Sequence, residues 1–410
     1  MELATEKAAV EVVEKVTEKR RRRRHWPLLV LVFVVVTILL VAFGLARQRS
    51  VDVSSPFEVK SLLAPSWQPL SPDQVSYTLV TQLSDDRLWM MEHHCRRWSH
   101  PMSIAVLSNR TLADVEVDLA GMGCTLAHLA VQVYSRHSMD DYPVNLLRNR
   151  ALSAVQTSHV VYLDSDFWPS VDLYETLQQE KIRQHLADDE KAALVVPAFQ
   201  LQRQCPETVD CSAQNIPLMP YNQAELFQVM LKHKAYRFDP TNKGGHGSTN
   251  YKAWLTQSAE DLVPIDCALS NRYEPYLVFR YFRDLPPFPE RFSGYGKNKM
   301  AWIMLLRRMG WAFWQVGESF VIHYPHRTSP SRLKWNGGDK GEQIGRPDDL
   351  DLANFQRAQT DQLFVEFREW LHNDVPDQTR IHRCKNAEDD DSRLWVPTVS
   401  SGARDLDSEE

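Results

Sequence analysis

An apolar run, Pro27–Ala46, dominates the N-terminal part of the chain: it holds twenty residues and no charged side chain. A helix of about 20 apolar residues crosses the ~30 Å hydrocarbon core of a bilayer, so we expect this run to span a membrane. Six basic residues, Lys19–Arg24, precede it, whereas only Arg47 and Arg49 follow closely. Basic residues gather on the cytosolic side of a span. The N-terminus is therefore predicted to be cytosolic and the remainder lumenal.

A cleaved signal peptide is the alternative for this run. The run is longer than the apolar core of a signal peptide, and no cleavage site of small residues follows it, so we favour an uncleaved anchor. The chain then divides into a cytosolic basic tail (1–25), a transmembrane signal anchor (26–46), a stem (47–72), a globular catalytic domain (73–385) and an acidic disordered tail (386–410).

The charge of the chain argues against nucleic acid as a partner. The formal net charge is -6, and residues 1–25 carry 8 basic against 5 acidic side chains, which leaves -9 for everything after them. An acidic body is a poor electrostatic match to phosphate backbones. We therefore expect no nucleic-acid binding.

All six cysteines follow the predicted span, on the oxidising side of the membrane, where disulfides persist. Cys205 and Cys211 are the favoured pair, because they lie close together in a polar stretch where a bridge would close a surface loop. The pairing of the other four stays open. Asn109 begins an Asn-Arg-Thr glycosylation sequence, which is consistent with a lumenal loop.

Apolar strands and helical patterns alternate along the globular part. Tyr77–Leu83 is predicted to be a buried strand, and helical spacing follows it. Further strands are expected at Ile104–Leu107, His159–Leu163 and Ala193–Phe199. Interleaved strands and helices favour an α/β fold with a mostly parallel, Rossmann-like sheet flanked by helices.

The strand His159–Leu163 ends in Asp164, Ser165 and Asp166. Ligands of open α/β sheets bind beyond the carboxyl ends of the strands, and alternate positions on extended backbone point the same way. Two convergent carboxylates repel unless a cation neutralises them. Hard oxygen ligands suit Mn²⁺ or Mg²⁺. A metal site is therefore favoured, and two turn-capping carboxylates are the alternative.

Between Val80 and His326 the sequence resembles the glucuronyltransferase domain of the LARGE-type glycosyltransferases, glycosyltransferase family 49. The matching blocks occur in order and are VTQLSDDRLWMMEHHC (80–95), YPVNLLRN (142–149), YLDSDFWPS (162–170), VVPAF (195–199), EPYLV (274–278), RFSGYGKNK (291–299) and VIHYPH (321–326). The resemblance implies a GT-A fold and a Mn²⁺-dependent, inverting transfer from a UDP-sugar, most simply UDP-glucuronate, to a glycan or glycoprotein acceptor. It also implies a single-pass type II Golgi membrane protein with a lumenal catalytic domain.

The resemblance assigns the metal to Asp164, Asp166 and His323, with His326 as the less favoured neighbour of His323. Taken alone, a histidine after an apolar strand is more often a satisfied core residue. The donor is assigned to Asp164, Ser165 and Asp166 together with Arg148 and Asn149, since a guanidinium suits diphosphate or sugar carboxylate. A surface arginine on an amphipathic helix is the alternative for Arg148.

The acceptor side is assigned to Gly294, Tyr295, Gly296 and Asn298, for which an ordinary turn is the alternative. An inverting displacement needs a base for the acceptor hydroxyl, and Glu274 is the first choice. Asp284 and Glu290 stay open, and Glu274 could instead pair with a buried arginine.

The sequence also departs from the family. Lys243–Asn250 is one glycine longer than the family's segment, and the stretch around Cys205 and Cys211 reads as an inserted loop. No second, xylosyl-transferring domain is expected, which favours a single addition over polymerisation. The alternatives are a catalytically inactive carbohydrate-binding protein on the same fold and a transferase with a different UDP-sugar. A homodimer is left open.

Overall fold

The computed structural model describes residue 57 and residues 64–135, 142–206, 208–329, 332, 333, 335 and 347–385, with side chains from residue 353 onward in the last range. The chain divides into Met1–Glu58 and Val59–Glu410, and the description concerns the second unit. The predicted anchor and both predicted tails lie outside the described residues. Within the described ranges, no helix has the length and apolar character needed to cross a bilayer.

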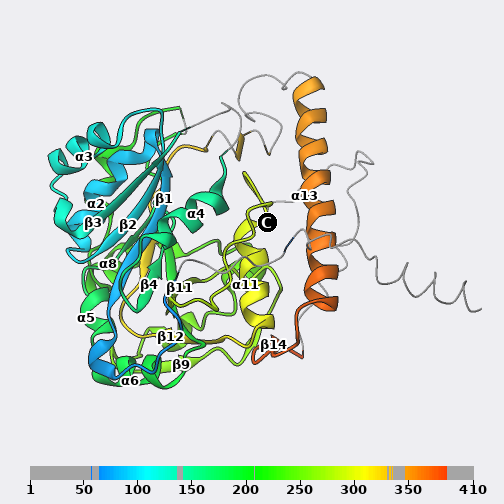
Figure 1. Cartoon of the computed structure of the whole chain (residues 1–410). Helices are drawn as coiled ribbons and strands as arrows, with labels where there is room; N and C mark the ends of the chain where they lie inside the picture. Colours follow the sequence, from blue (N-terminus) through cyan, green and yellow to red (C-terminus); the bar gives the residue numbers. More distant parts are fainter. Residues whose placement is uncertain are drawn as a thin grey trace, which may run out of the picture. The chain divides into compact units, whose positions relative to one another are not determined.

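An eight-stranded sheet forms the centre of the described unit (Figure 1). Its strands lie in the order β3 (Leu129–Tyr134), β2 (Met102–Leu107), β1 (Tyr77–Ser84), β4 (His159–Tyr162), β11 (Tyr276–Arg280), β6 (Ala192–Val196), β12 (Ala312–Val316) and β9 (Leu262–Pro264). β1 pairs in parallel with both β2 and β4. The chain therefore runs outward from β1 to β3 and returns to the other side of β1, which places a topological switch point between β1 and β4.

The predicted parallel arrangement holds for the first four strands, whereas the sheet as a whole is mixed. β11 runs antiparallel to both β4 and β6, and β9 runs antiparallel to β12. A parallel pair needs a long crossover, usually a helix. Only turns, the four-residue α10 and the short β9 and β10 lie between Asn250 and β11, so the chain can enter β11 from the opposite end.

A second sheet has the order β5 (Phe167–Pro169), β13 (Val321–His323), β7 (Ala198–Leu201) and β8 (Ala235–Arg237). β13 is antiparallel to β5, and His323 is the partner of Phe167. The residues just before β5 and just after β13 are therefore neighbours. A short parallel pair, β10 (Cys267–Ala268) and β14 (His382–Arg383), is joined by the Cys267–Cys384 disulfide.

Helices cover both faces of the large sheet, and others, such as α8 and α10, pack against the second sheet. They are α2 (Met91–Arg97), α3 (Leu112–Gly121), α4 (Val144–Ser153), α5 (Leu173–Leu177), α6 (Glu180–Asp188), α7 (Ser212–Asn215), α8 (Gln223–Leu231), α9 (Lys243–His246), α10 (Tyr251–Trp254), α11 (Asn298–Arg308) and α13 (Pro347–Asn373), and α13 stands beside α11 in Figure 1. Leu79 of β1 packs in one core with Leu119 of α3. Val80 packs in the other core with Leu147 of α4. β1 is apolar at both alternating sets of positions because both of its faces are covered.

Part of the predicted stem packs against the domain. Ala64 is buried, and the Arg283 backbone N–H donates to the Pro65 carbonyl at 2.9 Å. The Arg280 guanidinium lies 5.7 Å from the Trp67 ring centre. The compact unit therefore begins several residues before the predicted boundary at residue 73.

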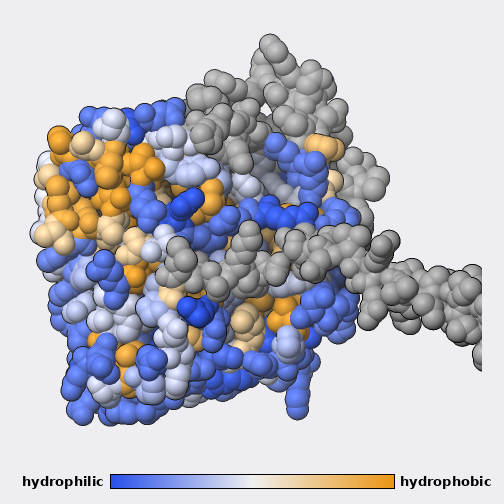
Figure 2. Space-filling view, in the orientation of Figure 1, coloured by the Kyte–Doolittle hydropathy of each residue, from blue (hydrophilic) through white to orange (hydrophobic). Residues whose placement is uncertain are grey.

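An apolar surface lies at the β3 edge of the large sheet. Leu112 and Val117 of α3 and the neighbouring Leu126 are exposed, Val117 to 70%. Figure 2 shows apolar atoms gathered in the region where Figure 1 places α3. Among the described strands β3 has a neighbour on one side only, so this apolar surface belongs to an open sheet edge.

Two buried histidines should make the stability of the fold depend on pH. Burial lowers the pKa of His94 to about 4 and that of His159 to about 3. The unfolded chain, with a histidine pKa of about 6.5, takes up protons over that interval and the folded chain does not. The free energy of unfolding is therefore expected to fall as the pH drops below about 6.5, by up to about 1.4 kcal/mol per pH unit for each histidine. Urea unfolding at about pH 7 and about pH 5 measures the slope; His159→Gln should flatten it, and equal stability of the native protein at both values contradicts the prediction.

Candidate functional site

The chain turns sharply where β4 ends. The Phe167 backbone N–H donates to the Asp164 carbonyl at 2.9 Å, which closes a turn and leads the chain from the large sheet into β5 of the second sheet. Ser165 lies in this turn, and its carbonyl contacts His94 Nε2 at 2.9 Å. The backbone between Asp164 and Asp166 therefore forms a turn. The prediction that both side chains point the same way assumed an extended backbone and is wrong on this point. The two carboxylates consequently enter two different groups of side chains.

Asp164 is enclosed by hydrogen-bond donors. Its Oδ1 accepts from Gln82 Nε2 (2.9 Å), Arg148 Nη2 (3.0 Å) and Tyr162 OH (2.6 Å), and its Oδ2 accepts from Tyr276 OH (3.0 Å) and Lys299 Nζ (3.2 Å). Burial alone would raise the pKa of Asp164, but Lys299 and Arg148 hold it well below its usual value. A carboxylate offers about four lone-pair sites, so these donors occupy the acceptor capacity of Asp164.

Arg148 of α4 forms an ion pair with the Asp164 carboxylate. Its side chain is 4% exposed, and besides Asp164 it donates to Tyr162 OH (2.5 Å), Asn145 Oδ1 (2.8 Å) and Asn298 Oδ1 (2.7 Å). Asn149 instead holds the segment after β11, through the Phe288 backbone and Glu290 Oε1. The predicted donor-binding residues on α4 thus have protein partners at their polar atoms in this structure.

Arg148→Met is expected to lower the free energy of unfolding by about 3–5 kcal/mol, because it removes one partner of a buried ion pair and leaves the other charge under-compensated. Arg150→Met, two residues along the same helix and exposed, is the matched control and should change it by about 0.5 kcal/mol or less. Urea unfolding of both variants measures the two changes in the free energy of unfolding. Similar effects of the two substitutions would contradict the buried role.

Asp166 joins two histidines from the end of β13. Its Oδ2 lies 2.8 Å from His326 Nε2, 3.8 Å from His323 Nε2 and 3.0 Å from Arg87 Nη1. Burial would raise the pKa of Asp166, but the hydrogen bond from His326 and the neighbouring charges lower it. Burial lowers the pKa of His323 to about 4, so this imidazole is neutral at pH 7, the form that ligates metals.

Within the described part of the chain, one group of three side chains has ligand atoms all within 4.8 Å of one another, and it consists of Asp166, His323 and His326. The pairing of β13 with β5 explains the group, because it sets His323 opposite Phe167 and next to Asp166. The predicted ligands Asp166 and His323 are brought together. Asp164 is not a member, whereas His326, the less favoured neighbour, is.

Glu274 lies beside the Asp164 group, two residues before β11 begins. Its backbone N–H donates to the Gly245 carbonyl at 2.9 Å, and its carboxylate accepts from the Met300 N–H in the first turn of α11. Burial raises the pKa of Glu274, and the charges of Lys299 and Arg148 partly offset this. A carboxyl with a raised pKa suits a general base better than an ordinary one. The other two candidate bases, Asp284 and Glu290, are exposed.

The predicted acceptor residues form a loop before α11. Gly294 (φ +72°) and Gly296 (φ +96°) flank Tyr295, whose side chain is 43% exposed. A Cβ at Gly296 would lie 2.7 Å from the Trp335 ring, so a glycine is required by both the backbone and the contact. Asn298 bonds both the Gly294 carbonyl and Arg148, which ties this loop to the Asp164 group.

Three further side chains belong to the site and were not predicted: Arg87, Gln82 and Lys299. Lys299 is 7% exposed, pairs with Asp164 and lies 4.0 Å from the Tyr276 ring centre. Gln82 Nε2 faces Asp164, and its buried Oε1 has no hydrogen-bond partner. All three stand in sequence blocks that resemble the family, and membership of these blocks was the signal that could have pointed to them.

Two other predicted sites lie in loops. Asn109 is exposed just before α3, and Cys205 and Cys211 form a disulfide. The other two bridges are Cys95–Cys124 and Cys267–Cys384, so no cysteine in the described chain is free.

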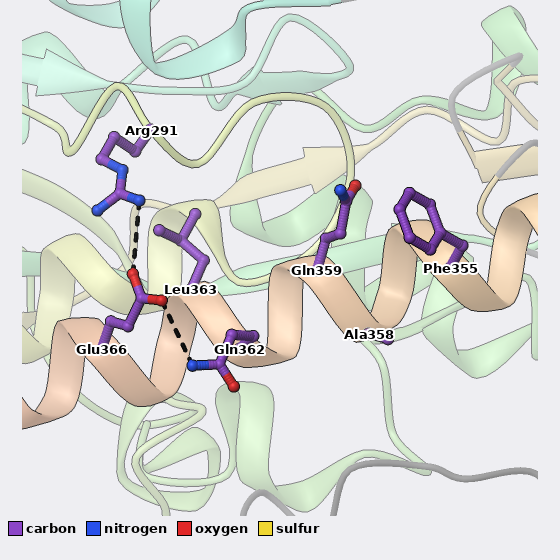
Figure 3. A pocket seen from close by; sticks show the side chains of 7 residues that line it. All are labelled: Arg291, Phe355, Ala358, Gln359, Gln362, Leu363 and Glu366. Carbon is purple, nitrogen blue, oxygen red and sulfur yellow. Dashed lines mark hydrogen bonds and ion pairs between the residues drawn. The ribbon is translucent and has the colours of Figure 1, made fainter.

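A shallow groove of about 320 Å³ runs along α13, next to the start of the acceptor-side loop. Figure 3 shows Arg291 of that loop reaching Glu366 at 3.4 Å across it. The groove is lined by Arg291, Phe355, Ala358, Gln359, Gln362, Leu363 and Glu366. None of the predicted catalytic, donor or metal residues lines it.

Comparison with known proteins places the chain among glycosyltransferases. The sequence profile of a family described as "Glycosyl-transferase for dystroglycan" matches residues 123–340. The xylosyl- and glucuronyltransferase LARGE2s of Gallus gallus is 34% identical over 276 residues, which are 66% of this chain and 35% of the relative. The xylosyl- and glucuronyltransferase LARGE1 of Homo sapiens is 34% identical over 266 residues, 63% of this chain and 32% of the relative.

The chain spans about a third of the length of these relatives. Among solved structures, GalNAc-T7 with UDP, GalNAc and Mn²⁺ aligns with 75% of this chain and 56% of its own at 11% identity and a TM-score of 0.38. The resemblance to family 49 is confirmed by the profile, which covers more than half of the 410 residues. The chain therefore belongs to glycosyltransferase family 49, the family described as glycosyltransferases for dystroglycan.

Proposed function

We propose that this chain is a metal-dependent, inverting glycosyltransferase that moves glucuronic acid from a UDP-sugar to a glycan acceptor. Family membership supports sugar transfer, and the names of the relatives, xylosyl- and glucuronyltransferases, support two candidate donor sugars. The observation that carries the proposal is the group of Asp166, His323 and His326 just beyond the carboxyl end of β4. That end lies at the β1/β4 switch point, where open α/β sheets bind ligands.

The donor atoms of this group fit a first-row transition ion such as Mn²⁺. Two imidazoles suit transition metals, a carboxylate suits Mn²⁺ or Mg²⁺, and Mg²⁺ prefers an all-oxygen shell. His326 Nδ1 contacts the Arg327 carbonyl, which can accept a hydrogen bond from Nδ1–H in the tautomer that leaves Nε2 as the ligand. When bound, the ion stabilises the negative charge that develops on a leaving diphosphate.

Two further side chains suit the donor. The Arg87 guanidinium stands at Asp166 and His326, where it can pair with phosphate oxygens. Gln82 presents a buried amide oxygen without a partner beside Asp164. Its orientation follows from chemistry, because an ionised carboxylate accepts only and must face the amide N–H₂. Gln82 Oε1 is therefore available to a hydroxyl or N–H of the donor.

Glu274 is proposed to take the proton of the acceptor hydroxyl as that oxygen bonds to the anomeric carbon and UDP leaves. The acceptor is proposed to lie over the loop from Gly294 to Asn298, where the Tyr295 ring is exposed. The uncharged run Pro27–Ala46 supports a type II membrane protein, and we propose a lumenal Golgi position on a GT-A fold.

A donor screen tests the proposal. Purified full-length protein is incubated with UDP-sugars and a glycan acceptor, with Mn²⁺, with Mg²⁺ and with chelator, and UDP release is measured. We expect release from UDP-glucuronate that depends on Mn²⁺, with a product of inverted anomeric configuration by NMR. Release from UDP-xylose alone would assign a different donor. Metal-independent release, or none from any UDP-sugar, would overturn the proposal and favour a binding protein.

A further inference from the structure

His326 is carried by a short irregular segment, residues 324–327, beyond the end of β13. One backbone bond connects this segment to the site, because the Tyr324 N–H donates to the Asp166 carbonyl (2.8 Å), and a second bond lies within the segment, from the His326 N–H to the Tyr324 carbonyl (2.8 Å). His323 differs, because β13 itself holds it between β5 and β7. The place of the His326 imidazole therefore depends on what fixes the backbone on either side of it.

A distant arginine fixes the backbone on the N-terminal side. Arg203 Nη1 donates to the Pro325 carbonyl at 2.9 Å, and its Nε donates to the Cys205 carbonyl at 3.1 Å. Its Nη2 donates to the carbonyls of Pro206 and Val209. These four acceptors are neutral carbonyls, so this guanidinium acts as a cross-link between the loop closed by Cys205–Cys211 and the residue before His326.

Two more contacts join the same loop region to this segment. Asn215, fully buried, lies with Nδ2 3.5 Å from the Pro325 carbonyl, and its Oδ1 accepts from the Gln204 N–H at 3.1 Å. On the C-terminal side, Arg327 Nη2 donates to the Thr208 carbonyl at 3.1 Å. The Arg327 carbonyl is also the group that contacts His326 Nδ1. The residues before and after His326 are thus both held by the region from Arg203 to Asn215.

We propose that Arg203 and the loop closed by the Cys205–Cys211 disulfide are positioning elements that hold His326 as a metal ligand. The inference rests on the proposed function in one respect, the metal at Asp166, His323 and His326. Partners that orient a ligand typically change metal affinity by about 10–100-fold when they are removed. A flexible lysine cannot replace Arg203, because a single ammonium cannot reproduce a fixed fork across four carbonyls.

The test measures Mn²⁺ binding to the full-length protein without donor, by the electron paramagnetic resonance signal of free Mn²⁺. Arg203→Met is expected to weaken binding by about 10–100-fold. The matched control is Arg308→Met, which removes a guanidinium that likewise bonds backbone carbonyls, at Val375 (3.0 Å) and His372 (3.1 Å), on the far end of α11. The control should bind Mn²⁺ as the native protein does.

The disulfide is tested in the same way. The double variant Cys205→Ser/Cys211→Ser is expected to weaken Mn²⁺ binding. Cys267→Ser/Cys384→Ser, which removes the β10–β14 bridge, should lower the melting temperature without weakening Mn²⁺ binding. If the Cys205–Cys211 bridge served stability alone, its double serine variant would have a lower melting temperature and would bind Mn²⁺ as the native protein does. Circular dichroism identifies any variant that fails to fold.

A double-mutant cycle separates positioning from general damage. In a His326→Ala background, Arg203→Met should weaken Mn²⁺ binding no further, since the ligand that it positions is already gone. A full additional loss in that background, or native affinity in Arg203→Met and the double serine variant, would overturn the inference while leaving the proposed function standing. If the native protein itself binds no Mn²⁺, the metal part of the proposed function fails first.

Discussion

Asp166→Asn is expected to abolish sugar transfer and to lower the free energy of unfolding by less than Asp164→Asn does, because Arg87, which faces Asp166, is more exposed than Arg148 and Lys299, which face Asp164. The Asp166 Oδ2 atom is 2.8 Å from the His326 Nε2 atom and 3.8 Å from the His323 Nε2 atom, so Asp166 supplies the negative charge of the three-residue group. Asparagine keeps the shape and removes that charge, without which a divalent ion has no anionic ligand in this group. Arg87, 18% exposed, reaches water when it loses its partner, so the fold should lose little. UDP release with Mn²⁺ and thermal unfolding of the same samples measure both effects.

Asp164→Asn is the control that distinguishes the two carboxylates, and we expect the opposite pattern from it. Arg148 and Lys299, the cations that face Asp164, are 4% and 7% exposed. Removing the carboxylate leaves them buried without their anion, which costs about 3–5 kcal/mol of stability. Loss of Mn²⁺ binding in Asp164→Asn at unchanged stability, with Mn²⁺ binding kept in Asp166→Asn, would return the metal to Asp164 and contradict this division of roles.

Four strands of the large sheet, β1, β2, β4 and β6, could be predicted from largely apolar runs of sequence. Tyr77–Leu83 became β1 almost residue for residue. The second sheet escaped prediction for a local reason: the expected strand Ala193–Phe199 is interrupted at Pro197, and its halves become β6 of one sheet and β7 of the other. A proline cannot donate to a ladder, so it marks the change of sheet. β5 and β8, with three residues each, carry too little periodicity to be recognised.

The sequence motifs predicted individual site residues but not the contacts between residues far apart in the chain. Asp166 and His323 were proposed from motifs, and their meeting depends on the antiparallel register of β5 and β13, which joins residues far apart in sequence. The place of His326 in the group depends on the irregular segment after β13, where no periodicity applies. Lys299 was missed for the same reason, since it reaches Asp164 across 135 residues of chain. Charges that pair over such separations are a property of the folded packing.

Glu274→Gln is expected to lower kcat by about 10²–10⁴-fold without destabilising the protein. Burial raises the pKa of Glu274 above its ordinary value, so the folded state favours the protonated form. The stability that the protonated Glu274 side chain provides is fully present below the pKa of Glu274 in the unfolded chain. It is lost as the pH rises through the pKa of Glu274 in the folded protein. At neutral pH the ionised carboxyl therefore costs stability, and a neutral amide that still accepts from the Met300 N–H should raise the melting temperature or leave it unchanged.

The same variant separates a base from a helix cap. If Glu274 takes the acceptor proton, Glu274→Gln keeps the native affinity for Mn²⁺ and loses turnover, whereas the exposed Glu290→Gln, the matched control on the neighbouring loop, stays within a few-fold of native kcat. If Glu274 only caps α11 through Met300, glutamine performs that task and kcat survives. A stable variant with native turnover would thus show that Glu274 is not the base. A drop in kcat together with a lower melting temperature would show that the ionised carboxyl stabilises the fold, which contradicts the destabilising effect expected from its raised pKa.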